Sequence, residues 1–193
     1  KALGDDRAQG WAYLGLARCY QGMAQKASLK IDADEYANLA EKGFDAAIKT
    51  LQKQRQYRYR YAMTRIHYAN FKIWQGNFTL AEGELTEALQ ITRELQSHYY
   101  EAQAQIFLCK IYRQRKQYSV LEVAARNVSE LHAQNRYSNL MANLRFIEQC
   151  LQGFAIEGQR CLQIGLIAKQ NKTHAIILAA GHKFIDHGLY HRE

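Results

Sequence analysis

Proline is absent from this 193-residue sequence. β-Sandwiches and barrels of this size depend on many turn dipeptides, in which proline is common. No stretch reaches the ~18–20 apolar residues of a membrane-spanning helix, and the first residues contain no apolar signal core. Strong helix formers such as Ala, Leu, Gln, Glu, Lys and Arg are abundant. We therefore predict an all-α protein without a membrane partner.

Cysteine is also scarce, and none of the four cysteines forms a CxxC pair. Structural zinc sites usually need two such close pairs. The four are Cys19, Cys109, Cys150 and Cys161. Their apolar helical context favours reduced, buried thiols, and hence a reducing compartment. We therefore expect a cytoplasmic protein. Because the sequence begins with Lys1 rather than Met, we also expect it to be part of a longer or processed chain.

Motifs for catalysis are missing as well. The pair Gly153-x-x-x-x-Gly158 lacks the Lys-Ser/Thr that follows in a phosphate-binding loop. There is no GxSxG elbow and no carboxylate pair in an apolar setting. His187 and His191 have the spacing of one helix face but lack the HExxH pattern. The sequence therefore predicts no enzyme, no cofactor and no metal site.

An internal repeat is what the sequence does contain. The segment Asn38-Leu39-Ala40-Glu41 recurs as Thr79-Leu80-Ala81-Glu82 and as Ser119-Val120-Leu121-Glu122. In each copy a helix-capping residue is followed three places on by Glu, which is the spacing of a capping box. Glutamate is also stabilising at the positive end of a helix dipole. We therefore predict that a helix starts or restarts near residues 38, 79 and 119.

The residues around these segments resemble the tetratricopeptide repeat. The clearest copies read Gln105-x-x-Leu108-Cys109-x-x-Tyr112-x-x-x-Lys116-x-Tyr118, Gly76-x-Phe78-x-x-Ala81-x-x-x-Leu85-x-x-Ala88 and Tyr13-x-x-Leu16-Ala17-x-x-Tyr20. The period is near 40 residues, whereas the standard repeat has about 34. Longer repeats of this kind are similar to those of MalT-type bacterial regulators.

The resemblance implies a fold and a division of the chain. The fold is an array of antiparallel helix hairpins with about nine helices, wound into a right-handed superhelix. The whole of 1–193 forms one repeat domain. Its units are expected at about 8–53, 58–96, 98–133 and 136–170, with a terminal helix over 173–190. In the first unit we expect a longer insert between the two helices, at about 22–34.

The resemblance also places a binding groove on the first helix of each unit, because these helices line the concave face of such an array. The groove residues are then Trp11, Arg18, Met63, Asn70, Trp74, Gln103, Lys110, Arg113 and Gln114. Arginine binds carboxylates with a planar fork of donors, and tryptophan is enriched at binding hot spots. Bases outnumber acids here, which favours an acidic ligand. Alternatively, Trp11 and Trp74 pack between repeats, and Lys110 and Arg113 form a solvated face.

Residues 53–72 form a basic and aromatic run that contains no Asp or Glu. Its tyrosines alternate with arginines, and such side chains can stack on bases and pair with phosphates. A nucleic-acid site would use Arg55, Arg58, Arg60 and Arg65. We favour another interpretation, in which the run joins the first two units, its tyrosines pack between repeats and its arginines extend outward.

Three functions are compatible with these features and with the formal charge of +8. The first is a non-catalytic sensor or partner-binding domain of a larger bacterial regulator, with a protein or acidic peptide, or a small-molecule effector, as its ligand. The second is a constitutive scaffold subunit of a multiprotein assembly. The third is nucleic-acid binding through residues 53–72, which we regard as the weakest.

Overall fold

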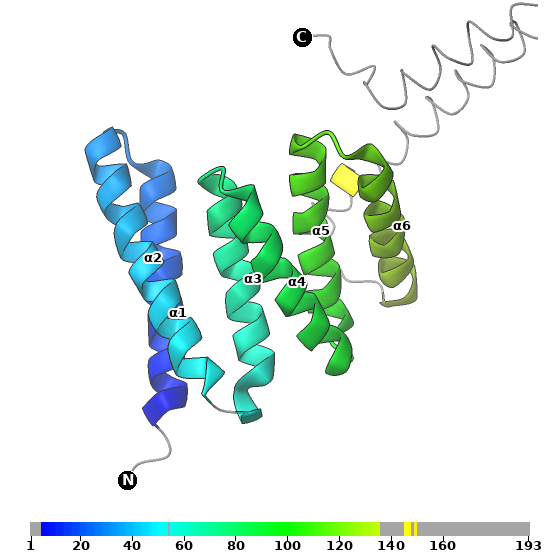
Figure 1. The fold of residues 1–193 in the computed structure, drawn as a ribbon. Coiled ribbons are helices and arrows are strands. Elements are labelled where there is room, and N and C mark those ends of the chain that lie inside the picture. The colour runs from blue at the N-terminus through cyan, green and yellow to red at the C-terminus, as the bar shows by residue number, and fades with distance from the viewer. Residues whose placement is uncertain (1–4, 54, 136–144, 148, 150–193) are drawn as a thin grey trace, which may run out of the picture.

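The computed structural model describes residues 5–53, 55–135, 145–147 and 149, and within them the secondary structure is helical, without a strand. The prediction of an all-α protein is therefore confirmed (Figure 1). The elements are α1 (Asp5–Lys26), α2 (Lys30–Gln52), the 3-10 helix η1 (Arg55–Tyr57), α3 (Arg58–Trp74), α4 (Phe78–Glu94), α5 (His98–Gln114) and α6 (Tyr118–Asn135). This part thus holds fewer helices than the nine predicted for the chain. Most of 136–170 and all of 173–190 lie outside the described residues.

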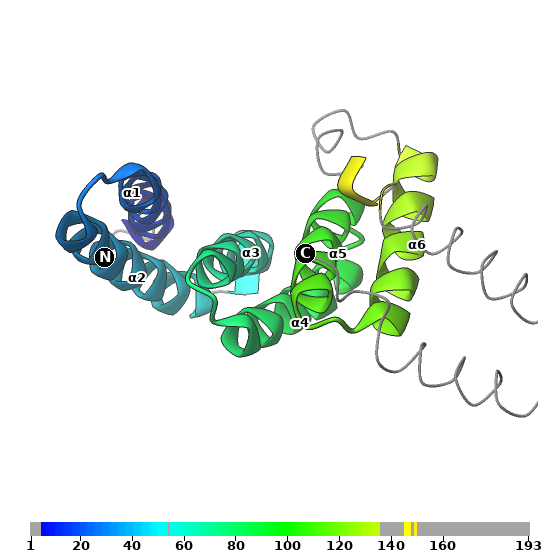
Figure 2. The same ribbon diagram turned by 90° about the horizontal axis from the view of Figure 1, so that it is seen from above.

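Neighbouring helices pack in sequence order, with the closest contacts within the pairs α1–α2, α3–α4 and α5–α6. Viewed from above (Figure 2), α1, α3 and α5 lie toward one side, and α2 and α4 toward the other. Helix α3 also contacts both α1 and α5 directly. The odd-numbered helices α1, α3 and α5 therefore form one layer, which we call the odd layer.

Three turns of the same type separate the helices from α3 onward. Helices α3, α4, α5 and α6 begin 20 residues apart, so two helices make the 40-residue period of the sequence. The middle residue of each turn has a positive φ, namely Gly76 (78°), Gln96 (53°) and Lys116 (58°). The next N–H in each turn bonds to the carbonyl five residues earlier, as from Asn77 to Lys72. This is the Schellman pattern, which ends one helix and reverses the chain.

The helix starts predicted from the repeated segments are partly wrong. Helices α4 and α6 begin one residue before Thr79 and Ser119, and the side chain of Asn77, not Thr79, caps α4 by accepting from the Leu80 N–H. Asn38 lies in the middle of α2, so no helix begins there. The predicted insert at 22–34 is also wrong. Both helices extend into it and leave only residues 27–29 between them, because this stretch has no proline to end a helix.

In two of its three copies the repeated glutamate joins neighbouring helix pairs, whereas Glu122 pairs with Arg126 of its own helix. Glu41 on α2 accepts hydrogen bonds from Lys72 Nζ (2.5 Å) and the Tyr68 hydroxyl (3.3 Å) on α3. Glu82 on α4 forms an ion pair with Arg115, directly after α5. The same residue in two successive repeats therefore binds the odd-layer helix of the next pair.

The core runs continuously through the stack. Phe44 of α2 is fully buried and lies with its ring centre 5.4 Å from Tyr68 and 5.6 Å from Phe71 of α3. Leu85 of α4 is likewise buried, in a cluster that includes residues of α3 and α5. Helices α2 and α4 thus supply apolar side chains to their own pairs and to the next ones. None of the helices in the described ranges is both long and apolar enough to cross a bilayer.

Candidate functional site

Charge is divided between the odd-numbered and even-numbered helices. Helices α1, α3 and α5 contain nine Lys or Arg residues and three Asp or Glu residues. Helices α2, α4 and α6 contain five Lys or Arg residues and eleven Asp or Glu residues. Among these six helices the positive balance therefore lies on the odd layer, which is the layer that carries the predicted groove residues.

Part of this positive charge is neutralised by acids of the even-numbered helices. Arg65 donates to Glu84 at 2.7 Å and pairs with Glu87 at 2.9 Å. Lys72 is buried and pairs with Glu41 of α2. These ion pairs connect helices within the stack. Their cations are consequently occupied and contribute little to the binding of another molecule.

Three other cations of the odd layer, Arg60, Lys110 and Arg113, contact aromatic rings. The Arg60 guanidinium lies 4.6 Å from the centre of the Trp11 ring, and Lys110 Nζ lies 5.0 Å from the centre of Phe107. Within the described residues, neither Arg60, Lys110 nor Arg18 forms an ion pair with a carboxylate. Cation–π contacts hold such groups in place without cancelling their charge.

Burial and charge lower the pKa of two groups on this layer. Burial, together with the positive charge of Arg18, lowers the pKa of His67 to about 4. His67 is therefore neutral at pH 7 and accepts or donates hydrogen bonds without adding charge. Burial also lowers the pKa of Lys110. A half-buried ammonium is incompletely solvated, so a carboxylate that reaches it gains more than at an exposed lysine.

The sequence left open whether the two tryptophans face a groove or pack between repeats, and the structure shows features of both. Trp11 is 43% exposed and Trp74 is 42% exposed. Yet Trp11 stacks with Arg60, and the Trp74 ring lies 5.8 Å from the centre of Phe71. One side of each ring is thus packed while the remainder faces solvent, which is the arrangement of an anchored contact residue.

The remaining predicted groove residues differ in accessibility. Arg18, Arg113 and Gln114 are exposed, while Asn70, Gln103 and Lys110 are half-buried. Arg113 lies over the ring of Phe146, with 5.4 Å between its guanidinium carbon and the ring centre. Met63 is only 7% exposed and packs among Leu14, Phe44 and Phe71, which leaves it almost no surface for a ligand.

The sequence analysis missed Tyr100, which the structure brings to the junction of all three odd-layer helices. Its hydroxyl donates to the Met63 sulfur at 3.1 Å, and its ring packs at a right angle to Tyr59. Arg18 of α1 is close enough to act on the ionisation of Tyr100, whose pKa is raised chiefly by burial. A signal was present, since Tyr100 lies three residues before Gln103, on a neighbouring position of the same helix.

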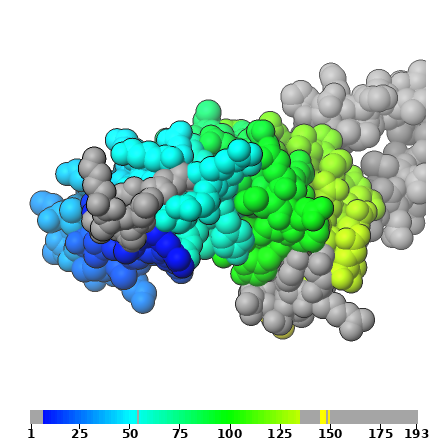
Figure 3. All heavy atoms as spheres, turned by 90° about the horizontal axis from the view of Figure 1, so that it is seen from below, coloured from blue at the N-terminus to red at the C-terminus, as the bar shows by residue number. Residues whose placement is uncertain are grey.

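The basic run at 53–72 does not present a row of free arginines. Arg58 forms an ion pair with Glu94, Arg65 is held by two glutamates, and Arg60 stacks on Trp11. Arg55 is exposed. Figure 3 shows the start of α3 between the first helix pair and the α4–α5 region. Phosphate binding depends on available cations, so this arrangement favours a junction between units over a nucleic-acid surface.

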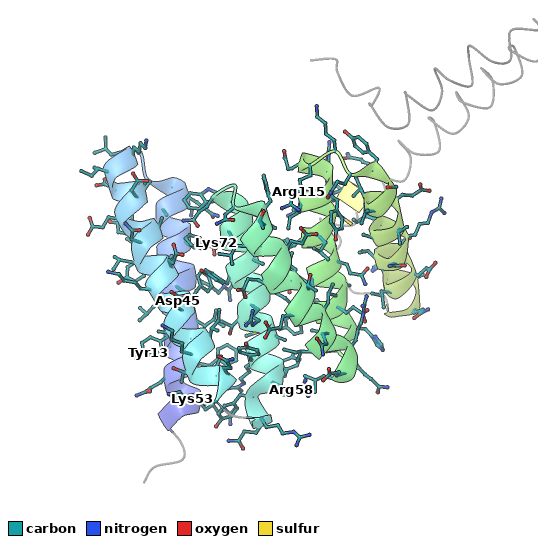
Figure 4. The ribbon with its side chains drawn as sticks, in the orientation of Figure 1. Tyr13, Asp45, Lys53, Arg58, Lys72 and Arg115 are labelled. Carbon is teal, nitrogen blue, oxygen red and sulfur yellow. The ribbon has the colours of Figure 1, made fainter. Side chains whose placement is uncertain are left out.

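A cleft lies between α2 and α4. Its volume is about 1070 Å³, and its walls carry both signs of charge. Lys53, Arg55 and Arg58 are among its lining residues, and Glu82 and Glu87 belong to the α4 wall. Figure 4 shows Lys53 and Arg58 together at one end of the molecule, and Lys72 and Arg115 at the other. Arg55 and Arg58 of this mixed cleft belong to the nucleic-acid site considered from the sequence, whereas its acidic α4 wall was not predicted.

Among the residues that the structure describes, no three His, Cys, Asp or Glu side chains gather as metal ligands do. No protein-family model matches the chain, and comparisons with curated proteins and with solved structures find no significant match. The resemblance to the tetratricopeptide repeat therefore stays a prediction from the motifs.

Proposed function

We propose that this chain is a non-catalytic binding domain whose odd layer takes up an acidic peptide segment of a protein partner. The observation that carries the proposal is the set of cations Arg18, Arg60 and Lys110. They lie on helices with few acids, and none has a carboxylate partner in the described part of the chain.

The chemistry of these side chains favours carboxylates. Arginine presents parallel N–H donors that fit a carboxylate, and the half-buried Lys110 is poorly solvated. Trp11 and Trp74 lie on helices of the same layer and offer flat apolar surface. Acidic residues interspersed with apolar ones would therefore satisfy both kinds of contact.

The tetratricopeptide resemblance supports the same proposal. In a right-handed superhelical array the first helices of the pairs line the concave face, and these correspond to α1, α3 and α5. Such a domain would serve as the partner-binding or sensing part of a larger regulator. A constitutive scaffold subunit would use the same face, with a partner that stays bound.

Tryptophan fluorescence offers a direct test, because Trp11 and Trp74 are the two tryptophans of the chain. We expect a Glu- and Asp-rich peptide with interspersed Leu to change the emission saturably, and its affinity to fall as salt rises. An oligonucleotide of equal charge should compete weakly.

Matched charge reversals identify the face. The double variant Arg18→Glu, Lys110→Glu should weaken peptide binding by about tenfold or more, since two charge-assisted contacts become repulsive. Lys42→Glu, Lys49→Glu changes the net charge equally but alters exposed residues of α2. Equal losses in the two variants would show that only net charge matters, and would refute the proposed face.

A further inference from the structure

Helix α1 is equivalent to α3 and α5, but one of its faces is left uncovered by the residues that the structure describes. Moving from α1 to α3 adds 52 to each residue number, and moving from α3 to α5 adds 40. The residues that face the partner helix of each pair are equally buried in all three helices. Leu14, Ile66 and Ile106 are each at most 2% exposed. The three helices are therefore equivalent elements of the stack.

The opposite face differs. Tyr68 and Leu108 are each 6% exposed, whereas Leu16, the equivalent residue of α1, is 51% exposed. Phe71 and Ile111 are fully buried, whereas the equivalent Cys19 is exposed. Ala12 and Met23 extend this line of exposed apolar residues along α1 by one turn in each direction. We call residues 12, 16, 19 and 23 the α1 stripe.

On α3 and α5 the equivalent face is covered by the second helix of the preceding pair. Ala40, Phe44 and Ala47 of α2 share one buried cluster with Tyr68 and Phe71 of α3. In the next pair the covering residues on α4 are Ala81, Leu85 and Ala88. Both covering helices thus read Ala-Glu-x-x-(Phe/Leu)-x-x-Ala, and the Glu bonds to the helix that is covered.

We propose that the α1 stripe is the docking surface for a further helix pair whose second helix carries this Ala-Glu-x-x-(Phe/Leu)-x-x-Ala pattern. The interface continues one that the chain already forms twice. The unit that ends a helical stack ordinarily has a polar outer face, and the stripe is apolar. Tyr20 supports the choice, because the equivalent residue of α3, Lys72, bonds to Glu41 of its covering helix, and the pKa of the equivalent Tyr112 of α5 is raised by burial and also by Glu82, which is close enough to act on it.

A duplicated helix pair provides the probe. Residues 5–57 are copied and joined directly to Asp6, which places the copied α2 against α1 as α2 lies against α3. The copy carries Cys19→Ser, so that the original Cys19 is the reporter thiol. We expect N-ethylmaleimide to modify it about tenfold more slowly than in the 193-residue chain, as followed by peptide mass spectrometry. An unchanged rate, together with the added helix content in circular dichroism, would overturn the proposal.

A pair of substitutions in the 193-residue chain tests the surface without relying on the extended protein. Leu16→Lys should leave the thermal midpoint nearly unchanged, whereas Leu108→Lys at the equivalent covered position should lower it strongly or prevent folding. If Leu16→Lys lowered the thermal midpoint as much as Leu108→Lys does, the stripe would already be covered. That result would overturn the proposal.

A second copy of the chain is the competing occupant. Sedimentation and Cys19 modification are therefore measured at rising protein concentration. We expect the thiol to stay reactive throughout. Protection that appears with dimerisation, and that Leu16→Lys abolishes, would assign the stripe to self-association and overturn the helix-pair partner.

Discussion

The first helix pair and the helices that follow it reach the same antiparallel packing by different means. Helices α1 and α2 have 22 and 23 residues, whereas α3, α4 and α5 have 17 each. The later helices are separated by turns with a left-handed middle residue, but none of residues 27–29 has a positive φ. At 1.5 Å per residue, the first pair is longer by about 8 Å, which Figure 1 makes visible.

The difference shows what sets the register of each pair. In the later helices the turn fixes where one helix ends and the next begins. In the first pair the helices approach closely at glycine. A Cβ on Gly43 would lie 3.0 Å from the Ala17 Cβ, and one on Gly10 would lie 2.7 Å from a Leu51 methyl carbon. Close packing along the helices therefore fixes the first pair, and turn geometry fixes the others.

Removal of a central core side chain should have the largest effect. Phe44→Ala deletes a fully buried ring between the first pair and α3, and we expect a loss of about 3–5 kcal/mol in the free energy of unfolding. Urea denaturation measures the loss in the free energy of unfolding, and hydrogen exchange shows which helices are destabilised. Amides of α1 and α2 should lose protection before those of α4 and α5. For Leu85→Ala, amides of α4 and α5 should lose protection before those of α1 and α2. The same order of protection loss in both variants would show that the two regions do not differ in this way.

Glycine substitutions test the close approach in the first pair. Gly43→Leu should cost about 1–3 kcal/mol, because α1 must move away to admit the side chain. Gly83 on α4 is the matched control, since a Cβ there meets no atom within 4 Å. Gly83→Leu should stabilise the fold by about 0.5–1 kcal/mol through helix propensity. Thermal denaturation compares the two variants. If Gly43→Leu and Gly83→Leu changed stability alike, close helix packing would not distinguish the first pair from the second.

The contact between the first pair and α3 should make stability depend on pH. His67 has a lowered pKa of about 4 in the folded chain, against an ordinary value of 6.5. The unfolded chain therefore binds more protons between these values, and stability that is full above pH 6.5 falls as the pH drops toward 4. We expect a loss of roughly 1–2 kcal/mol between pH 7 and pH 5. His67→Gln should reduce this loss, while His98→Gln, on an exposed side chain, should not.

The smallest effects should come from the turns. Gln96 and Lys116 have positive φ values that L-residues adopt at a cost. Gln96→Gly or Lys116→Gly should therefore raise the free energy of unfolding by about 0.5–1 kcal/mol, and Gly76→Ala should lower it by about 1 kcal/mol. Ser28→Gly, in the turn of the first pair, should bring no gain. Chemical denaturation measures these changes. If Ser28→Gly raised the free energy of unfolding as much as Gln96→Gly does, the two kinds of turn would not differ.

Much of the helical plan was readable from the sequence. The absence of proline and the spacing of Leu85 and Ala88 behind Ala81 predicted helices, and the recurring segments predicted starts near 79 and 119. The start predicted at Asn38 failed because a capping residue is a local signal. It acts only where the chain on its N-terminal side leaves the helix, and residues 30–37 do not.

The candidate site was partly predictable for a similar reason. Helical spacing alone places Arg18, Lys110 and the two tryptophans on the first helices of their pairs. It does not reveal which cations are occupied. Arg65 and Arg58 look equally available in the sequence, yet glutamates from 19 and 36 residues further along neutralise them. Met63 likewise looks like a groove residue and is buried by α1 and α2.

The sequence by itself determined the helices, their 40-residue period and the positive balance of α1, α3 and α5. Helix formation and side-chain spacing depend on neighbours within a few residues, so they can be read locally. Only the tertiary structure decided which cations remain unpaired, that Glu41 bonds to the next helix, and that Leu16 is exposed where Leu108 is buried. These properties depend on which helices lie beside one another, and no local pattern contains that information.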